Sequence, residues 1–213
     1  MPTALFVLGD SVSMHYGPHL QRALGPTFAY ARKGSVATAD AVEVPTDDNA
    51  NGGDSRMCLA YLRDRCSDPA FAPDLLLLNC GLHDVKQPPG GGPLQVPLDE
   101  YAANLRAMAA LLADTRPRTR LVFATTTPVC EEHHNGPRSG IWRCQRDVDQ
   151  CNDAARAVMV EVGAPVVDLA AFTLTQGDPR DTLPDGRHFT EPVRAAQGVF
   201  LAGWLHALRA TLT

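Results

Sequence analysis

Residues 75–78 read LLLL and residues 121–124 read LVFA, and neither run contains a polar residue. A strand with one face in water alternates apolar and polar side chains, whereas a strand covered by helices on both faces does not. The two runs therefore predict interior strands of a parallel sheet that lies between two layers of helices.

Short apolar runs alternate with amphipathic segments of helical length along the chain. The predicted strands are Ala4–Leu8, Phe28–Ala31, Asp74–Asn79, Leu121–Thr125 and Pro165–Leu169. The predicted helices are Val12–Leu24, Asp54–Cys66, Leu98–Thr115, Arg146–Val162 and Glu191–Leu212. These βα units predict an α/β fold, a three-layer α/β/α sandwich that binds ligands at the carboxyl ends of its strands. The 213 residues, 45% of them hydrophobic, suit one domain over residues 1–213.

Charge and hydropathy limit the kind of partner. The chain has 19 Lys and Arg against 24 Asp and Glu, a net charge of −5, which argues against nucleic acid or an anionic membrane surface as its partner. A small molecule is expected instead. The apolar stretch Ala4–Leu8 is too short for a signal peptide, and no later run approaches membrane length, so we expect a cytoplasmic protein. The oligomeric state is left open.

The cysteines and one His-rich loop are the candidates for disulfide or metal sites. The six cysteines are Cys58, Cys66, Cys80, Cys130, Cys144 and Cys151. Without an export signal, reduced buried thiols are expected, although Cys130 and Cys144 bracket a loop that a bridge could close. No CxxC or HExxH pattern occurs, so EEHH at 131–134 predicts a solvated loop and no metal is expected.

Three polar motifs follow the predicted strands or precede the last helix. They are GDS at 9–11, GLHD at 81–84 and DGRH at 185–188. A serine becomes a nucleophile when a histidine takes its proton and a carboxylate orients that histidine. Asp185 and His188, three residues apart around Gly186, suit that pairing better than the adjacent His83 and Asp84. The alternative is that Ser11 only caps the first helix.

Taken together, four blocks in order along the chain resemble the SGNH hydrolases of the GDSL esterase/lipase superfamily. The blocks are GDSV at 9–12, NGGDS at 51–55, GLHD at 81–84 and DGRHF at 185–189. The resemblance implies a flavodoxin-like parallel sheet of five strands in the order 2-1-3-4-5. It also implies Ser11 as nucleophile, His188 as general base and Asp185 as the acid that orients it. No cofactor is implied.

The resemblance further implies an oxyanion hole made by the backbone N–H groups of Ser11 and Gly53 and by the third side chain of the GLHD block. That family position holds asparagine, but this chain has His83. A neutral imidazole can donate one N–H, as an amide can, so the departure is compatible with activity. Asn79, at the end of the third strand, is an alternative source of an amide.

Two long loops, residues 86–97 and 128–144, follow strands and should lie on the ligand-binding rim. The candidate substrate-binding residues are Asp10, Tyr16, Asn79, Trp142 and Arg143. Their polarity favours a small-acyl, acetyl-like ester of a polar, carbohydrate-like substrate. The alternatives are an acyltransferase with the same triad, a lysophospholipase or thioesterase, or a non-catalytic flavodoxin-like module that binds phosphate or flavin at GDSVS.

Overall fold

The computed structural model describes residues 1–37, 42–43 and 48–211. Its central sheet consists of β1 (Thr3–Gly9), β2 (Phe28–Arg32), β5 (Leu75–Asn79), β6 (Arg120–Ala124) and β7 (Val166–Val167). The strand order is β2-β1-β5-β6-β7, and every neighbouring pair is parallel. Numbered along the chain, this is the predicted order 2-1-3-4-5, so the predicted sheet is confirmed.

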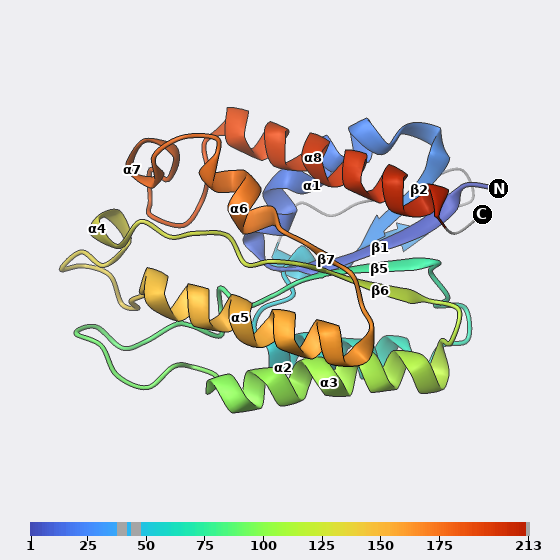
Figure 1. The fold of residues 1–213 in the computed structure, drawn as a ribbon, viewed down its shortest axis with the longest axis horizontal. Coiled ribbons are helices and arrows are strands. Elements are labelled where there is room, and N and C mark those ends of the chain that lie inside the picture. Colours follow the sequence, from blue (N-terminus) through green and yellow to red (C-terminus); the bar gives the residue numbers. More distant parts are fainter. Residues whose placement is uncertain (38–41, 44–47, 212–213) are drawn as a thin grey trace.

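Helices cover both faces of the sheet, as predicted. Figure 1 shows α1 (Ser11–Leu24) and α8 (Glu191–Ala210) on one face, and α2 (Ser55–Arg65), α3 (Leu98–Thr115) and α5 (Gln145–Val162) on the other. Helices α1 and α8 pack on each other, as do α2 with α3 and α3 with α5. The result is the expected three-layer arrangement.

Short elements add to this frame. They are α4 (Glu131–His134), α6 (Leu169–Leu174), α7 (Pro179–Thr182), the 3-10 helices Gly25–Thr27 and Asp48–Ala50, and the antiparallel pair β3 (Val36–Ala37) and β4 (Val42–Glu43). None was predicted, because elements of two to six residues carry no readable periodicity. The last predicted strand, Pro165–Leu169, is too long. Asp168 accepts a hydrogen bond from Ala171 N–H, which begins α6 and ends the extended segment.

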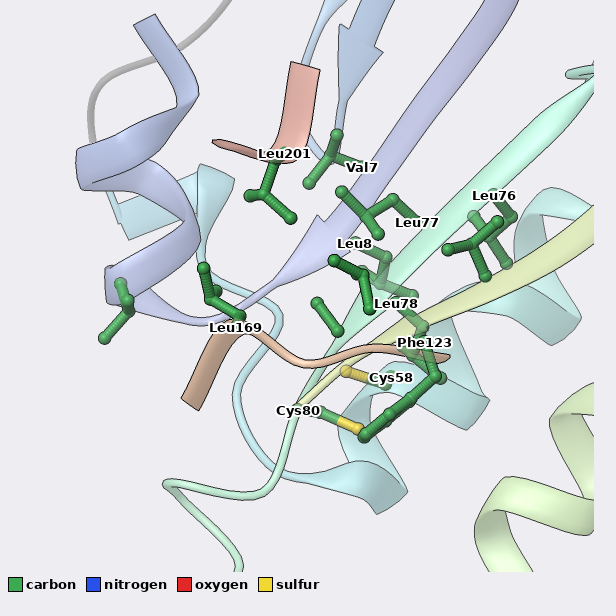
Figure 2. Packing of buried hydrophobic residues seen from close by; sticks show 14 of the residues in the cluster. Val7, Leu8, Cys58, Leu76, Leu77, Leu78, Cys80, Phe123, Leu169 and Leu201 are labelled. Carbon is green, nitrogen blue, oxygen red and sulfur yellow. The ribbon is translucent and has the colours of Figure 1, made fainter. Parts of the chain in front are cut away.

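The core explains why the LLLL run lacks alternation. All four leucines of β5 have no exposed surface, because β5 lies between β1 and β6 and helices cover both of its faces. Figure 2 shows Leu8, Leu78 and Phe123 of the three central strands close together, with Cys58 and Cys80 beside them. All six cysteines lie within the described ranges and are free thiols, so Cys130 and Cys144 are not bridged.

Buried carboxylates fix the helix ends that face the carboxyl edge of the sheet. Asp10 accepts from Val12 N–H at 2.9 Å and so begins α1 at Ser11. Asp84 accepts from Ser55 N–H at 2.9 Å, which ties the GLHD turn to the start of α2. A lost N-terminal cap costs about 1 kcal/mol. Gly52 N–H donates to the Gly9 carbonyl at 2.7 Å, so the first motif segment is joined to the second and Asp84 joins the second to the third.

The two long loops meet on the same edge. Gln87 and Trp142 exchange two backbone hydrogen bonds of 2.9 Å and thereby join residues 86–97 to residues 128–144. Both loops lie beyond the carboxyl ends of the strands, on the left in Figure 1, which is the predicted rim. In the described part of the chain, no helix combines the length and hydropathy that crossing a membrane requires.

Candidate active site

Three side chains from opposite ends of the sequence meet at the carboxyl edge of the sheet. Ser11 Oγ lies 2.8 Å from His188 Nε2, and His188 Nδ1 lies 2.7 Å from Asp185 Oδ2. Ser11 begins α1 directly after β1, whereas Asp185 and His188 belong to the turn before α8. The structure therefore brings together the serine, histidine and carboxylate that the motifs predicted.

The turn that carries Asp185 and His188 is shaped by its own backbone. Asp185 Oδ1 accepts from the N–H groups of Arg187 at 3.1 Å and His188 at 2.7 Å. These two bonds orient the carboxylate, whose other oxygen contacts the His188 ring. Gly186 has a φ of 79°, and a Cβ there would lie 2.5 Å from the backbone nitrogen of His134. Only glycine fits this left-handed position, which turns the histidine back toward the sheet.

The protonation states suit proton transfer from Ser11. Burial raises the pKa of Asp185, but the two backbone hydrogen bonds and the His188 ring outweigh it and lower that pKa to about 2. Burial lowers the pKa of His188, and the nearby carboxylate only partly offsets this. At neutral pH the ring is therefore uncharged, with its proton on Nδ1 toward the carboxylate. Nε2 is left to accept from the Ser11 hydroxyl.

His15, the histidine nearest to Ser11 in sequence, does not contact the Ser11 hydroxyl. His15 lies one helical turn along α1 and packs edge-on against the His188 ring, with centroids 4.8 Å apart. Burial is the main cause that lowers the pKa of His15 to about 4, so this contact is between two uncharged rings. His19 pairs with Glu191 at 2.9 Å. Of these three histidines, only His188 contacts the Ser11 hydroxyl, and the His15 ring packs against the His188 ring.

A cavity of about 230 Å³ opens beside Ser11 and His188. Among the described residues, its lining consists of Ser11, Asn51, Leu82, His83, Lys86, Ile141, Arg143, Arg187 and His188. The predicted residues Ser11, His83, Arg143 and His188 thus share one hollow. A ligand in this cavity would contact the hydroxyl and the imidazole together.

His83 is held with one nitrogen toward a cation. Its Nδ1 lies 2.9 Å from Lys86 Nζ, and an ammonium group can only donate, so Nδ1 accepts and the proton of the neutral ring is on Nε2. Burial first, and then the charges of Lys86 and Arg143, lower the pKa of His83 to about 3. His83 is therefore a neutral ring whose single N–H is at Nε2.

The prediction for Gly53 needs a correction. Its N–H was expected to be free for an oxyanion, but it donates to Asn51 Oδ1 at 2.9 Å, and Gly53 is not among the cavity-lining residues. Its φ of 71° and the close approach of Met57 explain why glycine occupies the position. Asn51 lines the cavity, and its Oδ1 occupies the Gly53 N–H that was expected to face a ligand there.

Two of the predicted substrate-binding residues are core residues instead. Tyr16 has no exposed surface and donates from its hydroxyl to Asn79 Oδ1 at 3.3 Å. Asn79 in turn donates to the carbonyl oxygen of Ala124 at 3.0 Å. Together they tie α1 to the ends of β5 and β6. Neither side chain belongs to the cavity lining: Tyr16 lies on the core-facing side of α1, and Asn79 is buried at the end of β5.

Asp10 and Trp142 also lie outside the cavity lining. Asp10 is buried, caps α1, and has its pKa raised to about 6 by that burial. Trp142 is half-buried, and its backbone pairs with Gln87, so it anchors the loop. In both cases a neighbouring residue lines the cavity instead, Ser11 beside Asp10 and Ile141 and Arg143 beside Trp142.

Arg143 occupies its predicted place in the cavity wall. It is almost fully buried, with Nε donating to the Leu82 carbonyl at 2.6 Å and Nη1 donating to His134 Nε2 at 2.6 Å. Burial, followed by the charge of Arg187, lowers its pKa to about 10, so the guanidinium remains protonated at neutral pH. Its position fixes the second long loop against the GLHD turn.

Sequence reasoning missed three polar lining residues: Asn51, Lys86 and Arg187. Each lies inside or within two residues of a motif block, and that proximity was the available signal. Proximity to a motif is a weak signal, because the neighbours of a motif residue point in different directions. Only the folded structure shows which of them face the cavity. In the described part of the chain, no three His, Cys, Asp or Glu side chains are grouped as metal ligands.

One known protein family matches most of the chain. The sequence profile of the GDSL-like Lipase/Acylhydrolase family matches residues 7–195, which include all four motif blocks. The chain belongs to this family. The resemblance predicted from the motifs is therefore confirmed, and the serine, histidine and carboxylate lie in blocks that the GDSL family match covers.

Solved structures of other proteins share the fold. The lipase/acylhydrolase from Enterococcus faecalis superposes with a TM-score of 0.69 at 15% identity, over 95% of each chain. The inhibitor-bound aryl esterase of M. smegmatis gives 0.63 at 18% identity, covering 97% of this chain and 99% of that one. A carbohydrate acetylesterase from Sinorhizobium meliloti gives 0.62 at 14%, again over 97% and 99%. At these identities the likeness concerns the fold alone.

A relative from mouse has a higher sequence identity than these structures, but over a shorter stretch of the chain. The isoamyl acetate-hydrolyzing esterase 1 homolog of Mus musculus is 35% identical over 103 residues. Those residues are 45% of this chain and 41% of that protein, so the match spans less than half of either.

Proposed function

We propose that this chain hydrolyses carboxylic esters through a covalent acyl intermediate on Ser11. The observation that carries the proposal is the hydrogen-bonded series from Ser11 Oγ through His188 to Asp185, with distances of 2.8 and 2.7 Å, at the wall of a cavity. Membership of the GDSL-like lipase/acylhydrolase family supports the same chemistry.

In the first half of the reaction, Ser11 Oγ attacks the ester carbonyl carbon while His188 Nε2 takes the hydroxyl proton. The ionised Asp185 stabilises the imidazolium that forms. The tetrahedral intermediate then collapses, the bond to the alcohol oxygen breaks, and His188 returns the proton to the leaving alcohol. In the second half, His188 deprotonates a water that attacks the acyl group, and the acid leaves as Ser11 regains its proton.

The oxyanion requires donors aimed into the cavity. As the first residue of α1, Ser11 has a backbone N–H that the helix leaves unpaired. The Nε2–H of His83 is the second donor, because Lys86 occupies the other ring nitrogen. The Gly53 N–H can join them only when Asn51 Oδ1 releases it. Each step uses the chain's own side chains and backbone, so the mechanism requires no cofactor.

The size and polarity of the cavity favour a small acyl group on a polar alcohol. Its volume of about 230 Å³ lies below the range of about 300–1,000 Å³ that holds drug-sized ligands, and polar side chains outnumber Leu82 and Ile141 in its wall. A long acyl chain would need an apolar trough.

The test is turnover of 4-nitrophenyl acetate together with labelling by an active-site phosphonate. We expect hydrolysis of the ester and a single adduct mapped by mass spectrometry to Ser11. The Ser11→Ala variant should lose both while keeping its circular dichroism spectrum. Ser67→Ala removes the hydroxyl of an exposed serine just after the end of α2 and serves as the matched control. An unlabelled, inactive wild-type protein would refute the proposal.

A further inference from the structure

Three cationic side chains line the cavity beside Ser11. They are Lys86, Arg143 and Arg187, and each comes from a different segment of the chain. The protein as a whole carries a net charge of −5, so the cavity wall is positively charged in a protein that is negatively charged overall. A wall with one sign of charge in a small cavity raises the local concentration of ligands of the opposite sign.

No carboxylate side chain belongs to the cavity lining among the residues that the structure describes. Arg143 donates to two uncharged acceptors, the Leu82 carbonyl and the His134 ring. Lys86 contacts the uncharged ring of His83. Arg187 Nε lies 3.7 Å from Asp185 Oδ2, an oxygen that already accepts from His188. Of the three cations, only Arg187 has a carboxylate within ion-pair distance among the described residues, and that carboxylate also accepts from His188.

The cations also act on one another. Burial and then the charge of Arg143 lower the pKa of Lys86, and burial and then the charge of Arg187 lower the pKa of Arg143. Carboxylates near enough to oppose this repulsion in part are Asp10, Asp54 and Asp185. Three cations held close together and partly away from water repel one another, so an anion that entered the cavity would be bound favourably.

We propose that the preferred substrate is an ester that carries a carboxylate, and that this carboxylate binds between Arg143, Arg187 and Lys86 beside the reacting ester. The inference rests on the proposed function, because it assigns the substrate class of the same site. A guanidinium offers two parallel N–H groups to a carboxylate, which orients the ester as well as holding it. The narrow cavity then accepts a short acid and excludes long acyl chains.

Cations near Ser11 could instead act on the oxyanion of every substrate. The two roles differ in a measurable way, because a carboxylate site changes the ratio of kcat/KM between an acidic ester and its neutral counterpart. A role confined to the oxyanion changes both values equally and leaves the ratio unchanged. The ratio also cancels any general loss of activity in a variant.

The experiment uses two pairs of esters. In 4-nitrophenyl hemisuccinate against 4-nitrophenyl acetate, the carboxylate is on the acyl part. In 4-acetoxybenzoate against phenyl acetate, it is on the alcohol part. Each kcat/KM is divided by the rate constant of hydroxide hydrolysis of the same ester. We expect the acidic member of one pair to be favoured by about 10- to 100-fold, the range for a hydrogen-bonded charge pair.

The variants identify the group responsible. Arg187→Gln should lower the acidic-to-neutral ratio by about tenfold or more, whereas Arg187→Lys, which keeps the charge, should retain much of it. Arg180→Gln removes the same charge from an exposed arginine that pairs with Glu132 outside the cavity, and should leave the ratio unchanged. Circular dichroism checks the fold of each variant.

Two outcomes would overturn the inference: wild-type ratios near one for both ester pairs, or a ratio that Arg187→Gln leaves intact. A failure of the proposed function has a different signature, namely no turnover of any of the four esters and no phosphonate adduct on Ser11. That result would remove the basis of this inference as well.

Discussion

Replacing His83 tests whether its ring takes the place of the amide that the GDSL family has at this position. Two single variants are needed. His83→Ala removes the Nε2–H altogether, and His83→Asn restores an amide N–H on a shorter side chain. The substrate is 4-nitrophenyl acetate, which has no carboxylate and so avoids the cations of the cavity wall.

The expected magnitude follows from the number of donors. With the Gly53 N–H engaged by Asn51, the proposed oxyanion hole has two donors in this structure, the Ser11 N–H and His83 Nε2–H. Loss of one such donor costs on the order of 100- to 1,000-fold in kcat, or about 2.7–4 kcal/mol. KM should change little, because the donor acts on charge that develops only in the transition state. The asparagine variant should keep most of the activity.

Lys86 adds a second arm to this test. Its ammonium fixes the proton of His83 on Nε2, so Lys86→Met should reduce kcat in the wild-type background. In the His83→Asn background an amide replaces the ring, and the same substitution should cost much less. The difference between the two costs is the coupling between Lys86 and His83.

The assay is stopped-flow measurement of nitrophenolate release, which separates the acylation step from KM effects, with circular dichroism as the control for folding. A His83→Ala enzyme with full kcat would show that other groups bind the oxyanion. Equal costs of Lys86→Met in both backgrounds would show that the lysine does not act through the ring.

Two further predictions concern acidity and stability. Burial lowers the pKa of His188, and this ring must be neutral to accept the Ser11 proton, so the acid limb of kcat/KM against pH should lie below 6.5; a limb at or above 6.5 would contradict the role given to it. Asp84→Ala should lower the free energy of unfolding in urea by about 1–3 kcal/mol, because it leaves the buried Ser55 N–H without its acceptor. Asp84→Asn, which keeps an acceptor oxygen, should cost less, and equal losses in the two variants would point to another cause.

The strands of the parallel sheet could be predicted because their signals are local, and the order of the strands followed from the resemblance of the four motif blocks to the GDSL family. Runs such as residues 75–78 show burial on both faces without any knowledge of the neighbours, and the alternation with helical segments predicts parallel connections. The ends of elements were less predictable. The final predicted strand ends early because Asp168 caps α6, which begins at Leu169. Neither propensity nor periodicity shows whether such a short segment is a strand or the start of a helix.

The serine, histidine and carboxylate could be predicted for the same reason. Asp185 and His188 are three residues apart on one glycine turn, and Ser11 directly follows a strand, so each group depends on backbone geometry within a few residues. Their meeting then needs α8 to pack on α1, which brings the turn before α8 to Ser11 at the start of α1.

The remainder of the site depends on side-chain directions in packed loops. Asn51 takes the Gly53 N–H, and Tyr16 turns into the core. Lys86 reaches the ring of His83, and Arg187 faces the cavity. Hydrogen bonds of this kind join groups whose separation is set by several elements at once. In addition, consecutive residues of a loop point their side chains in different directions. The sequence by itself therefore determined the sheet and the reacting groups, and only the tertiary structure decided which donors and charges surround them.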